Sequence, residues 1–558
     1  MGLVLPWPTY RRRVAGDNAV LTISVVKETD MNDLIEYLST RALPTTSRPN
    51  VSPTPVQSIT LGMVNVRQSS VCQIGEATTH DRFHLLRRLL ALLQDPDLTG
   101  QRPTNFTSIC CNVDYACALH TDKYNSGCSH IIAGGDYRGG EFFLEGGEGE
   151  AVTIQHEGCQ LQGAAVDIRH AWCVFDGKQR HMTMPYSNGR RVSVVFFSVP
   201  LDKCDARDLV TLRSLGFIVP NPFALDVPFK WPYQIRICTA GRAQTIAQDT
   251  LGIISRDRSV PTHCITLCVK EPEVDAYRGF GFDVMTVSGA AGLPEQRQQC
   301  LRGMPHGSWA LFLDDDLTDI MLLEEMSLHE LVVLGFLSAK ARGAELWGLN
   351  VSKNRMHLRD TVSTCPGLVN GYFFGVVTSE RAQQMTPVSD TVGGAGEDVE
   401  RTLRYYEAGG VLRMNFACAV ARTQTNAGGL QGHYKDRAAR RAAHEFVIRS
   451  LAVEFPQLVI FDDCSANKST FLQARGQAEE HKCHLCDKAF TRKNALAHHK
   501  RWFHPDPALP QPELIECPNC KRTFRSKKAM LVHVRALRCH SNRGRKYDSN
   551  APPKHTDV

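Results

Sequence analysis

The sequence predicts a chain of several domains: an all-β domain, then an α/β domain, then two small Cys/His units. Short β-like runs alternate with glycine-rich turns between Ile109 and Val199, which is typical of an all-β fold. Strands alternate with helical segments from Tyr233 to about Asp463, which is typical of an α/β fold. Two similar Cys/His units then occupy residues 481–540.

Length and composition agree with this division. A chain of 558 residues predicts three or four folded units at about 150 residues each. The sequence has no run of 18 apolar residues and no signal peptide in MGLVLPWPTYRRR, so we expect no membrane partner. Some of the 20 cysteines stand at metal-ligand spacings and the rest are expected to be mostly buried thiols, which favours a reducing, intracellular compartment; we expect the nucleus.

In the N-terminal part, apolar residues recur at helical spacing from Arg82 to Gln94, which predicts a helix. The runs EFFLE, AWCVF and RVSVVFFSV predict strands. Residues 200–232 read as a connector with one short helix. The expected division is an N-terminal extension of the all-β domain (1–100), its core (101–200), a connector (201–232), an α/β domain (233–463), a linker (464–480), a first Cys/His unit (481–504), a second one (517–540) and a basic tail (541–558).

A candidate iron site lies in the all-β domain. His120 and Asp122 form a His-x-Asp pair, and His181 follows farther along the chain. Two histidines and one carboxylate leave three open positions on Fe(II), as a non-haem oxygenase needs: two for 2-oxoglutarate and one for O₂. Arg191 can bind the far carboxylate of 2-oxoglutarate through its planar fork. Ser193 points to the same strand face and can add a hydrogen bond.

The stretch from GGEFFLE to RHMTMPYSNGRRVSVVFF resembles the double-stranded β-helix dioxygenases, over about Phe106–Pro200. Within them it looks most like the TET/JBP branch, which oxidises the methyl group of 5-methylpyrimidines in nucleic acids. The resemblance implies a double-stranded β-helix with flanking helices. His130 and His170 are alternative ligands and Arg190 an alternative anchor, but none fits the motif's order as well. Prolyl hydroxylases share the same HxD…H…R pattern.

A candidate sugar-transfer site follows the hydrophobic strand WALFL. Asp314 and Asp316 stand at the carboxyl end of that strand, where α/β folds bind ligands, and can hold Mg²⁺ or Mn²⁺ against a nucleotide diphosphate. Arg242, expected to open a helix after the first strand, can meet the nucleotide. Asp398 and Glu397 begin a later helix, and one of them can act as general base on an acceptor hydroxyl.

The order of these features, a first strand followed by Arg242, then the aspartates after WALFL and then the Glu397–Asp398 pair, resembles that of GT-A glycosyltransferases over about Tyr233–Asp463. More specifically, it resembles the glycosyltransferases associated with TET/JBP enzymes. The resemblance implies a nucleotide sugar as donor and a hydroxylated base as acceptor. A nucleotidyltransferase is the alternative, but its usual Gly-Ser donor loop is not found in the sequence.

The C-terminal Cys/His units have the spacing of ββα zinc fingers. The expected zinc ligands of the first finger are Cys483, Cys486, His499 and His504. Those of the second finger are Cys517, Cys520, His533 and either His540, which we favour, or Cys539. Residues 481–558 hold 17 lysines and arginines against six acidic residues. Because two alanines and a valine occupy three of the six base-reading positions, we expect mainly phosphate contacts to nucleic acid, with DNA the expected form. A protein-binding pair of fingers is the alternative.

Together these features predict a bifunctional, base-modifying enzyme. An Fe(II)/2-oxoglutarate-dependent dioxygenase would hydroxylate the methyl group of 5-methylcytosine or thymine, and a nucleotide-sugar-dependent glycosyltransferase would cap the new hydroxyl. A protein hydroxylase-glycosyltransferase acting on prolyl or lysyl side chains is the alternative, because it would share both catalytic sites.

Overall fold

The computed structural model divides the chain into two compact units, residues 1–474 and 475–558. The structure describes residues 30–49, 51–65, 71–75, 78–79, 82–219, 231–287, 292–364, 367–385, 387–422, 433–461, 469–471 and four two-residue strands of the second unit. Within the first unit we call residues 30–219 the β-domain and residues 231–471 the α/β domain. The chain is thus multidomain, with separate mixed sheets and helices.

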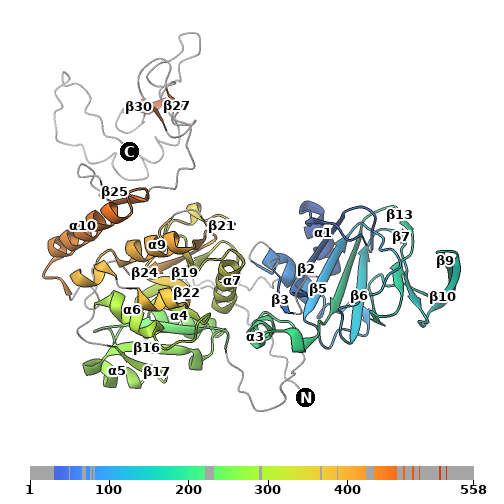
Figure 1. Cartoon of the computed structure of the whole chain (residues 1–558), viewed down its shortest axis with the longest axis horizontal. Coiled ribbons are helices and arrows are strands. Elements are labelled where there is room, and N and C mark those ends of the chain that lie inside the picture. Colours follow the sequence, from blue (N-terminus) through green and yellow to red (C-terminus); the bar gives the residue numbers. More distant parts are fainter. Residues whose placement is uncertain are drawn as a thin grey trace, which may run out of the picture. The chain divides into compact units, whose positions relative to one another are not determined.

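An eight-stranded sheet forms the centre of the β-domain (Figure 1). In order, its strands are β1 (Thr45–Thr46), β2 (Val56–Asn65), β5 (Ser108–Val113), β14 (Arg191–Phe197), β6 (Cys128–Gly135), β11 (Ala171–Asp176) and β4 (Thr99–Gly100), and β3 (Cys72–Ile74) pairs with β2. All neighbours are antiparallel except β11 and β4. The sheet therefore includes strands that precede residue 101.

A smaller sheet covers one face of the large one. Its strands are β12 (His181–Thr183), β8 (Phe142–Glu145), β10 (Cys159–Val166) and β9 (Glu150–His156), and β13 (Tyr186–Ser187) pairs separately with β7 (Arg138–Gly139). Phe142 and Leu144 of the small sheet share a buried cluster with Ile131 and Phe175 of the large sheet. The two sheets therefore pack face to face through apolar side chains.

Helices α1 (Met31–Thr40) and α2 (Phe83–Ala91) pack on the other face of the large sheet, and α3 (Ala206–Ser214) follows β14. The side chain of Asp30 caps α1 by accepting from the backbone N–H of Asp33. Met31 of α1 comes so close to β6 that a Cβ at Gly134 would lie 2.5 Å from its Cγ. Only glycine leaves room for the helix at this point.

The α/β domain is built on a second eight-stranded sheet. Its strands are β17 (Asp283–Val287), β16 (Ile265–Lys270), β15 (Gln234–Cys238), β18 (Trp309–Asp314), β22 (Phe373–Val377), β20 (Leu346–Leu349), β23 (Val411–Met414) and β21 (Val362–Ser363). The first four run parallel, and β22 pairs antiparallel with β18. Beside this sheet, β19 (Leu317–Leu322) pairs with β24 (Ala417–Ala421), and β25 (Val459–Phe461) pairs with β26 (Ser469–Phe471).

Side-chain alternation along β18 gives this sheet two helical layers. Leu311 and Leu313 pack in one core with α4 (Thr250–Asp257) and α7 (Leu328–Ala341). Ala310 and Phe312 pack in another core with α6 (Leu293–Leu301), α8 (Glu380–Gln384) and α9 (Glu397–Ala408). Helices α5 (Val274–Arg278) and α10 (Arg437–Glu454) complete the set described in this domain.

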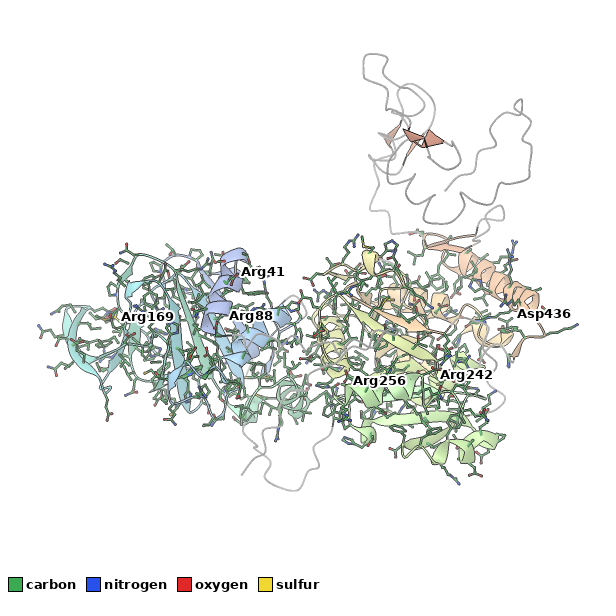
Figure 2. All side chains as sticks on the ribbon, turned by 180° about the vertical axis from the view of Figure 1, so that it is seen from behind. Arg41, Arg88, Arg169, Arg242, Arg256 and Asp436 are labelled. Carbon is green, nitrogen blue, oxygen red and sulfur yellow. The ribbon has the colours of Figure 1, made fainter. Side chains whose placement is uncertain are left out.

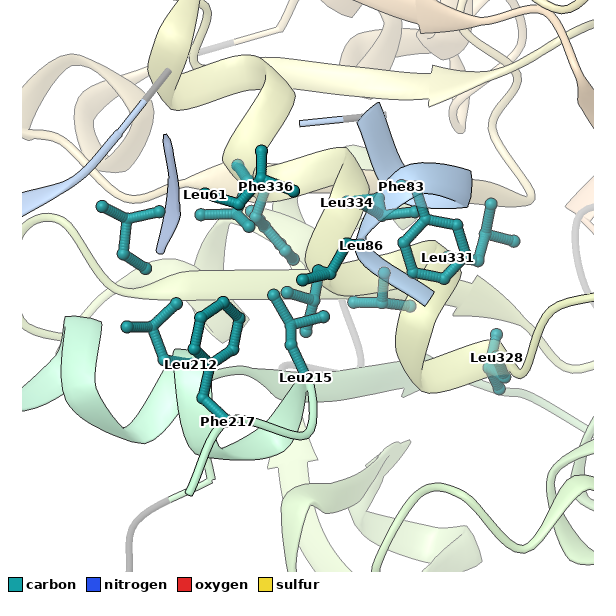
Figure 3. Close-up of a cluster of buried hydrophobic side chains, with 14 of the residues drawn as sticks. Leu61, Phe83, Leu86, Leu212, Leu215, Phe217, Leu328, Leu331, Leu334 and Phe336 are labelled. Atoms are coloured by element: carbon teal, nitrogen blue, oxygen red, sulfur yellow. The ribbon is translucent and has the colours of Figure 1, made fainter. Parts of the chain in front are cut away.

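Buried side chains of α2, α3 and α7 belong to one hydrophobic cluster (Figure 3). Leu86, Leu212 and Leu331 represent the three helices in it. Asp208 of α3 also accepts from the Lys340 ammonium of α7 at 3.0 Å. The β-domain and the α/β domain of the first unit therefore share part of their core.

Most elements expected from periodicity are confirmed. The predicted helix over Arg82–Gln94 is α2, the expected helix of the connector is α3, and the three β-runs are β8, β11 and β14. The helix expected to open at Arg242 is wrong: residues 243–249 form turns, and α4 begins at Thr250. The Thr250 hydroxyl donates to the Asp314 carbonyl at 2.6 Å, which fixes the helix start at the end of β18 instead.

In the second unit the structure describes two short hairpins. β27 (His481–Lys482) pairs with β28 (Ala489–Phe490), and β29 (Ile515–Glu516) pairs with β30 (Thr523–Phe524). These are the places where two ββα fingers need their hairpins. Among the described residues, no helix is both long and apolar enough to cross a membrane.

Candidate functional site

Two histidines of the β-domain are brought together by backbone pairing. His181 begins β12, and its N–H donates to the His120 carbonyl at 3.0 Å, while the His120 N–H donates to the His181 carbonyl at 3.0 Å. The two ring centroids are consequently 4.3 Å apart. Asp122 joins them because its N–H donates to the carbonyl of Gly177 at 2.7 Å.

The three side chains point their ligand atoms at one another. One ligand atom each from His120, Asp122 and His181 lies within 4.8 Å of the other two. The Nε2 atoms of both histidines are 3.7 Å from an oxygen of Asp122. Each Nδ1 lies 2.8 Å from a backbone carbonyl, of Ala118 or Gln179. Those carbonyls hold the proton on Nδ1 and leave Nε2 free to bind a metal.

The surroundings keep this triad in its metal-binding form. Burial lowers the pKa of His181, and the neighbouring His120 lowers it further, so the neutral imidazole is favoured. The Asn125 amide donates to Asp122 at 3.1 Å and to Ser129 at 3.2 Å, which fixes the carboxylate. This donor set, two imidazoles and one carboxylate, fits Fe(II). His130 and His170 belong to no metal-ligand group in the described part of the chain.

Arg191, the predicted anchor for 2-oxoglutarate, is buried at the start of β14 and only 2% exposed. Its guanidinium stacks near the rings of Tyr137 and Tyr186, at 5.3 and 5.7 Å, and donates to the Gly140 carbonyl at 3.3 Å. Burial lowers its pKa. Its Nε has no hydrogen-bond partner among the described residues. A buried guanidinium with spare donors is suited to an anionic ligand.

The neighbouring positions distinguish the two candidate arginines. The partly exposed side chain of Arg190 forms an ion pair with Asp114, with 3.6 Å between the nitrogen and the oxygen. Ser193 is buried two residues beyond Arg191 and shares its strand face. Cys117 connects this region to the triad, because its Sγ is 3.2 Å from Nδ1 of His120 and it interacts electrostatically with Arg191.

In the α/β domain, the predicted aspartates stand where β18 ends, and arginines hold them. Asp315 accepts from Arg242 at 2.5 Å and from the Thr239 hydroxyl at 2.6 Å. Arg242, labelled in Figure 2, also pairs with Asp316 at 3.0 Å. Asp314 accepts from Arg297 at 2.6 Å. The turn after β15 thus brings Arg242 to the aspartates at the end of β18, called the acidic edge below. The sequence did not predict this pairing, and the expected contact of Arg242 with a nucleotide stays a prediction.

The acidic edge carries closely spaced like charges. Burial raises the pKa of Asp314 to about 7, with Asp315 and Asp316 adding to the effect and Arg297 opposing it. Burial also raises the pKa of Asp315 and of Asp316, against the attraction of Arg242. Among the described residues the three aspartates do not converge as a metal-ligand group, because each pairs with an arginine. Carboxylate oxygens are the ligand type that Mg²⁺ or Mn²⁺ prefers, so a divalent cation would share them with Arg242 and Arg297.

Arg297 of α6 was not singled out by the sequence. Besides Asp314, it donates to Glu397 at 2.7 Å and to the carbonyl of Gly371 at 2.7 Å. Glu397 also pairs with Arg401 of its own helix. Burial works to raise the pKa of Glu397, but the two arginines outweigh it and hold the pKa below its usual value. The two ion pairs of Glu397 therefore favour a structural role for its carboxylate.

Asp398, the next residue, has the opposite environment. Burial raises its pKa, and the charge of Glu397 raises it further. Its Cβ would be 3.6 Å from a Cβ placed on Gly371, in the turn that precedes β22. A carboxyl group with a raised pKa beside a glycine turn is suited to take a proton from an incoming hydroxyl.

The C-terminal prediction is confirmed for one finger. Residues 481–504 match the family of zinc fingers of the C2H2 type. All eight expected zinc ligands of the two fingers, and Cys539, lie outside the described residues.

No curated protein matches the chain. Among solved structures, it is similar to NgTET1 in complex with 5mC DNA (12% identity, 31% of this chain and 67% of that one, TM-score 0.19). It is also similar to TarS residues 1–349 of S. aureus (12%, 40% and 64%, 0.26) and to glucosyl-3-phosphoglycerate synthase of Mycobacterium tuberculosis with Mn²⁺ and UDP-glucose (11%, 43% and 86%, 0.27). The chain thus spans about two thirds of the first two. Since all these TM-scores are below 0.5, function has to be inferred from this chain's own side chains.

Proposed function

We propose that the chain is a bifunctional enzyme that hydroxylates the methyl group of a 5-methylpyrimidine in nucleic acid and then adds a sugar to the new hydroxyl. The observation that carries the proposal is the convergence of His120, Asp122 and His181 in the same domain as the buried guanidinium of Arg191. Two imidazoles, one carboxylate and a cation without a carboxylate partner among the described residues suit Fe(II) and 2-oxoglutarate.

In the first reaction, bound Fe(II) would supply the activation of O₂, coupled to decarboxylation of 2-oxoglutarate. The residues of the β-domain hold and orient the reactants. Arg191 would bind the far carboxylate of 2-oxoglutarate through its free donors, with Ser193 beside it. Asn125 would keep Asp122 in its ligating orientation, and the carbonyls of Ala118 and Gln179 would do the same for the histidines.

The target base must leave its stack to reach a buried metal. The support for a base as substrate is the TET/JBP-like string around His181 and Arg191, together with the basic C-terminal unit and its zinc finger. Lysines and arginines of that unit would hold the phosphates without reading sequence. Protein binding by the fingers is the alternative. It can be tested independently of the two proposed reactions.

In the second reaction, Asp314 and Asp316 would hold Mg²⁺ or Mn²⁺ at the diphosphate of a nucleotide sugar. Arg242 lies between Asp315 and Asp316, so its charge also stands where the diphosphate would develop negative charge. Asp398 would accept the proton of the acceptor hydroxyl. Glu397 was the other candidate base, but its two ion pairs favour a role in positioning Arg297.

Mass spectrometry of nucleosides tests the proposal directly. DNA and RNA containing 5-methylcytosine or thymine are incubated with the full chain, Fe(II) and 2-oxoglutarate, with and without a panel of nucleotide sugars. We expect a gain of one oxygen in the first case and of a hexose- or pentose-sized mass in addition in the second. A prolyl or lysyl peptide pool in parallel provides the other substrate class, and modification of peptides alone would overturn the proposal.

A further inference from the structure

Three cysteines of the α/β domain gather in one place, next to the end of β18, where Cys238 of β15 is the register partner of Asp314. The Sγ atoms of Cys238, Cys268 and Cys300 all lie within 4.8 Å of one another, and Cys238 and Cys300 are 3.9 Å apart. All three side chains are buried, with at most 7% exposed. They are 30 or more residues apart in the sequence, so no short Cys-x-x-Cys motif reveals them.

The sheet and one helix assemble this group. Cys238 ends β15, and in the parallel register it pairs with Cys268 of β16. Paired residues of neighbouring strands project to the same face, and α6 covers that face and brings Cys300 onto both. Cys300 lies one turn after Arg297 on α6. The same helix thus places one residue on the thiols and another on Asp314.

The three Sγ atoms, called the sulfur triangle below, are separated by distances that suit a bound metal ion. Metal–thiolate bonds are about 2.3 Å long, so sulfurs around one ion lie about 3.8 Å apart in the tetrahedral geometry that zinc prefers and about 4.0 Å apart in a plane. The separation of 3.9 Å between Cys238 and Cys300 already meets this, and the limit of 4.8 Å on the other pairs leaves only a small closure. Rotation of a side chain about one bond is enough for a closure of this size.

Two cations stand beside the triangle. Arg236 lies on the same strand face as Cys238, and its Nε is buried without a hydrogen-bond partner among the described residues. A hydrogen bond with Cys238 and burial raise the pKa of Cys268, and Arg236 opposes this increase. Despite a hydrogen bond with Cys268 that lowers it, the pKa of Cys238 is raised by a hydrogen bond with Cys300 and by burial, and Arg297 opposes this increase. The two guanidinium groups therefore reduce the cost of forming buried thiolates, which burial makes unfavourable.

We propose that Cys238, Cys268 and Cys300 bind one thiophilic metal ion, Zn²⁺ or Cu(I), as a structural site beneath the acidic edge. Soft thiolate ligands select these ions over Mg²⁺ and Mn²⁺, so the site does not compete with Asp314 and Asp316 for the same metal. Each sulfur that binds releases its proton to solvent, so one ion replaces three protons; the group then carries one negative charge with Zn²⁺ or two with Cu(I), beside the cations Arg236 and Arg297. The bound ion ties α6 to β15 and β16.

Metal counting on the full chain tests this site. The reduced protein is saturated with Zn²⁺, desalted, and its zinc content per chain is measured by native mass spectrometry; a second arm adds Cu(I) under anaerobic conditions. Cys300→Ala and Cys268→Ser remove one ligand each. Cys264→Ala is the matched control, because Cys264 is also buried in this domain but belongs to no metal-ligand group among the described residues.

We expect the native chain and Cys264→Ala to hold one ion more than Cys300→Ala and Cys268→Ser, in the zinc arm or in the copper arm. Added metal should also raise the Tm of the native chain and of Cys264→Ala by more than it raises the Tm of the two ligand variants. The fingers contribute equally to all four proteins, so they cancel in the comparison. Equal metal content in all four, with equal Tm shifts, would show that the thiols only pack against one another and would overturn the proposal.

Discussion

At the scale of single residues, the direction of a side chain distinguishes two adjacent arginines. Arg190 and Arg191 are neighbours at the start of β14, but successive residues of a strand face opposite sides. Arg190 reaches Asp114 at the partly exposed side, whereas Arg191 points into the buried side between Tyr137 and Tyr186. A ligand carboxylate can satisfy only the second of them without displacing a protein carboxylate.

Replacement of Arg191 should therefore act on the co-substrate. Arg191→Lys keeps a charge but loses the planar fork, and each charge-assisted hydrogen bond lost costs about 1.5–3 kcal/mol, or roughly a tenfold to hundredfold increase in the KM for 2-oxoglutarate. Steady-state succinate production measures this. Arg190→Lys is the matched control and should leave the KM near that of the native enzyme. A similar KM increase in both variants would contradict the assignment of Arg191.

Substitutions at the neighbours Glu397 and Asp398 should affect different properties: stability at Glu397 and catalysis at Asp398. Asp398→Asn should lower kcat for sugar transfer by roughly 100-fold or more, because the general base is lost, and should leave the Tm nearly unchanged. Glu397→Gln breaks ion pairs with Arg297 and Arg401 in a buried site and should cost about 3–5 kcal/mol of stability. Thermal melts and transfer assays on both variants measure the contrast. A catalytic loss confined to Glu397→Gln would identify Glu397 as the base.

At the scale of elements, the sequence predicted those parts whose signal is local. His120, Asp122 and His181 follow a motif, and α2 shows helical periodicity. Strand β2 was not predicted, because it is buried on both faces for most of its length and its pattern does not alternate. Arg297 was not predicted because its partner Glu397 is 100 residues away. Such contacts are visible only after the strands have been ordered.

The positive charge of the C-terminal unit and its bound zinc should each contribute to nucleic-acid binding. Deleting residues 475–558 removes 18 lysines and arginines, so nucleic-acid affinity should fall and its dependence on salt should become flatter. Cys483→Ser with Cys486→Ser keeps those charges but removes two expected zinc ligands. Fluorescence anisotropy at several salt concentrations should place this variant between the native chain and the deletion. Unchanged affinity at low salt after deletion would instead favour the protein-binding alternative.

A buried histidine where α7 meets the connector should make stability depend on pH. Burial lowers the pKa of His329 from 6.5 to about 4, and its ring contacts the Tyr233 hydroxyl at 3.0 Å and the Ser214 carbonyl at 3.2 Å. The unfolded chain binds a proton at this group near pH 6.5, and the folded chain only near pH 4. Stability from this group is therefore full above pH 6.5 and falls by up to about 3 kcal/mol as the pH decreases to 4.

Thermal melts of the native chain and His329→Gln at several pH values measure this contribution. The difference in Tm between the two should shrink as the pH falls from 6.5 to 4, because glutamine does not titrate. His263→Gln, at an exposed histidine of the same domain, is the control and should follow the native curve. A Tm difference that stays constant with pH would show that His329 does not titrate in this range.

At the scale of the whole molecule, the two candidate reaction centres use different ligands on different sheets. The iron triad belongs to the β-domain, and the aspartates stand at the end of β18 in the α/β domain. Imidazole ligands suit Fe(II) and oxygen ligands alone suit Mg²⁺ or Mn²⁺, so neither site needs the metal of the other. The only chemical link required between them is the hydroxyl group that the first reaction makes and the second consumes.

The two reactions should therefore be separable but ordered. Asp316→Ala should leave hydroxylation intact, so that the hydroxymethyl base accumulates without sugar. Asp122→Ala should block glycosylation of a methylated substrate, while a synthetic substrate that already carries the hydroxymethyl group should still receive sugar. Asp319→Ala, an exposed aspartate on β19, is the matched control for the first variant and should complete both steps. Nucleoside masses from each variant with each substrate give the result. Sugar on a base that was never hydroxylated, or sugar found only on protein, would contradict this order even if both activities are present.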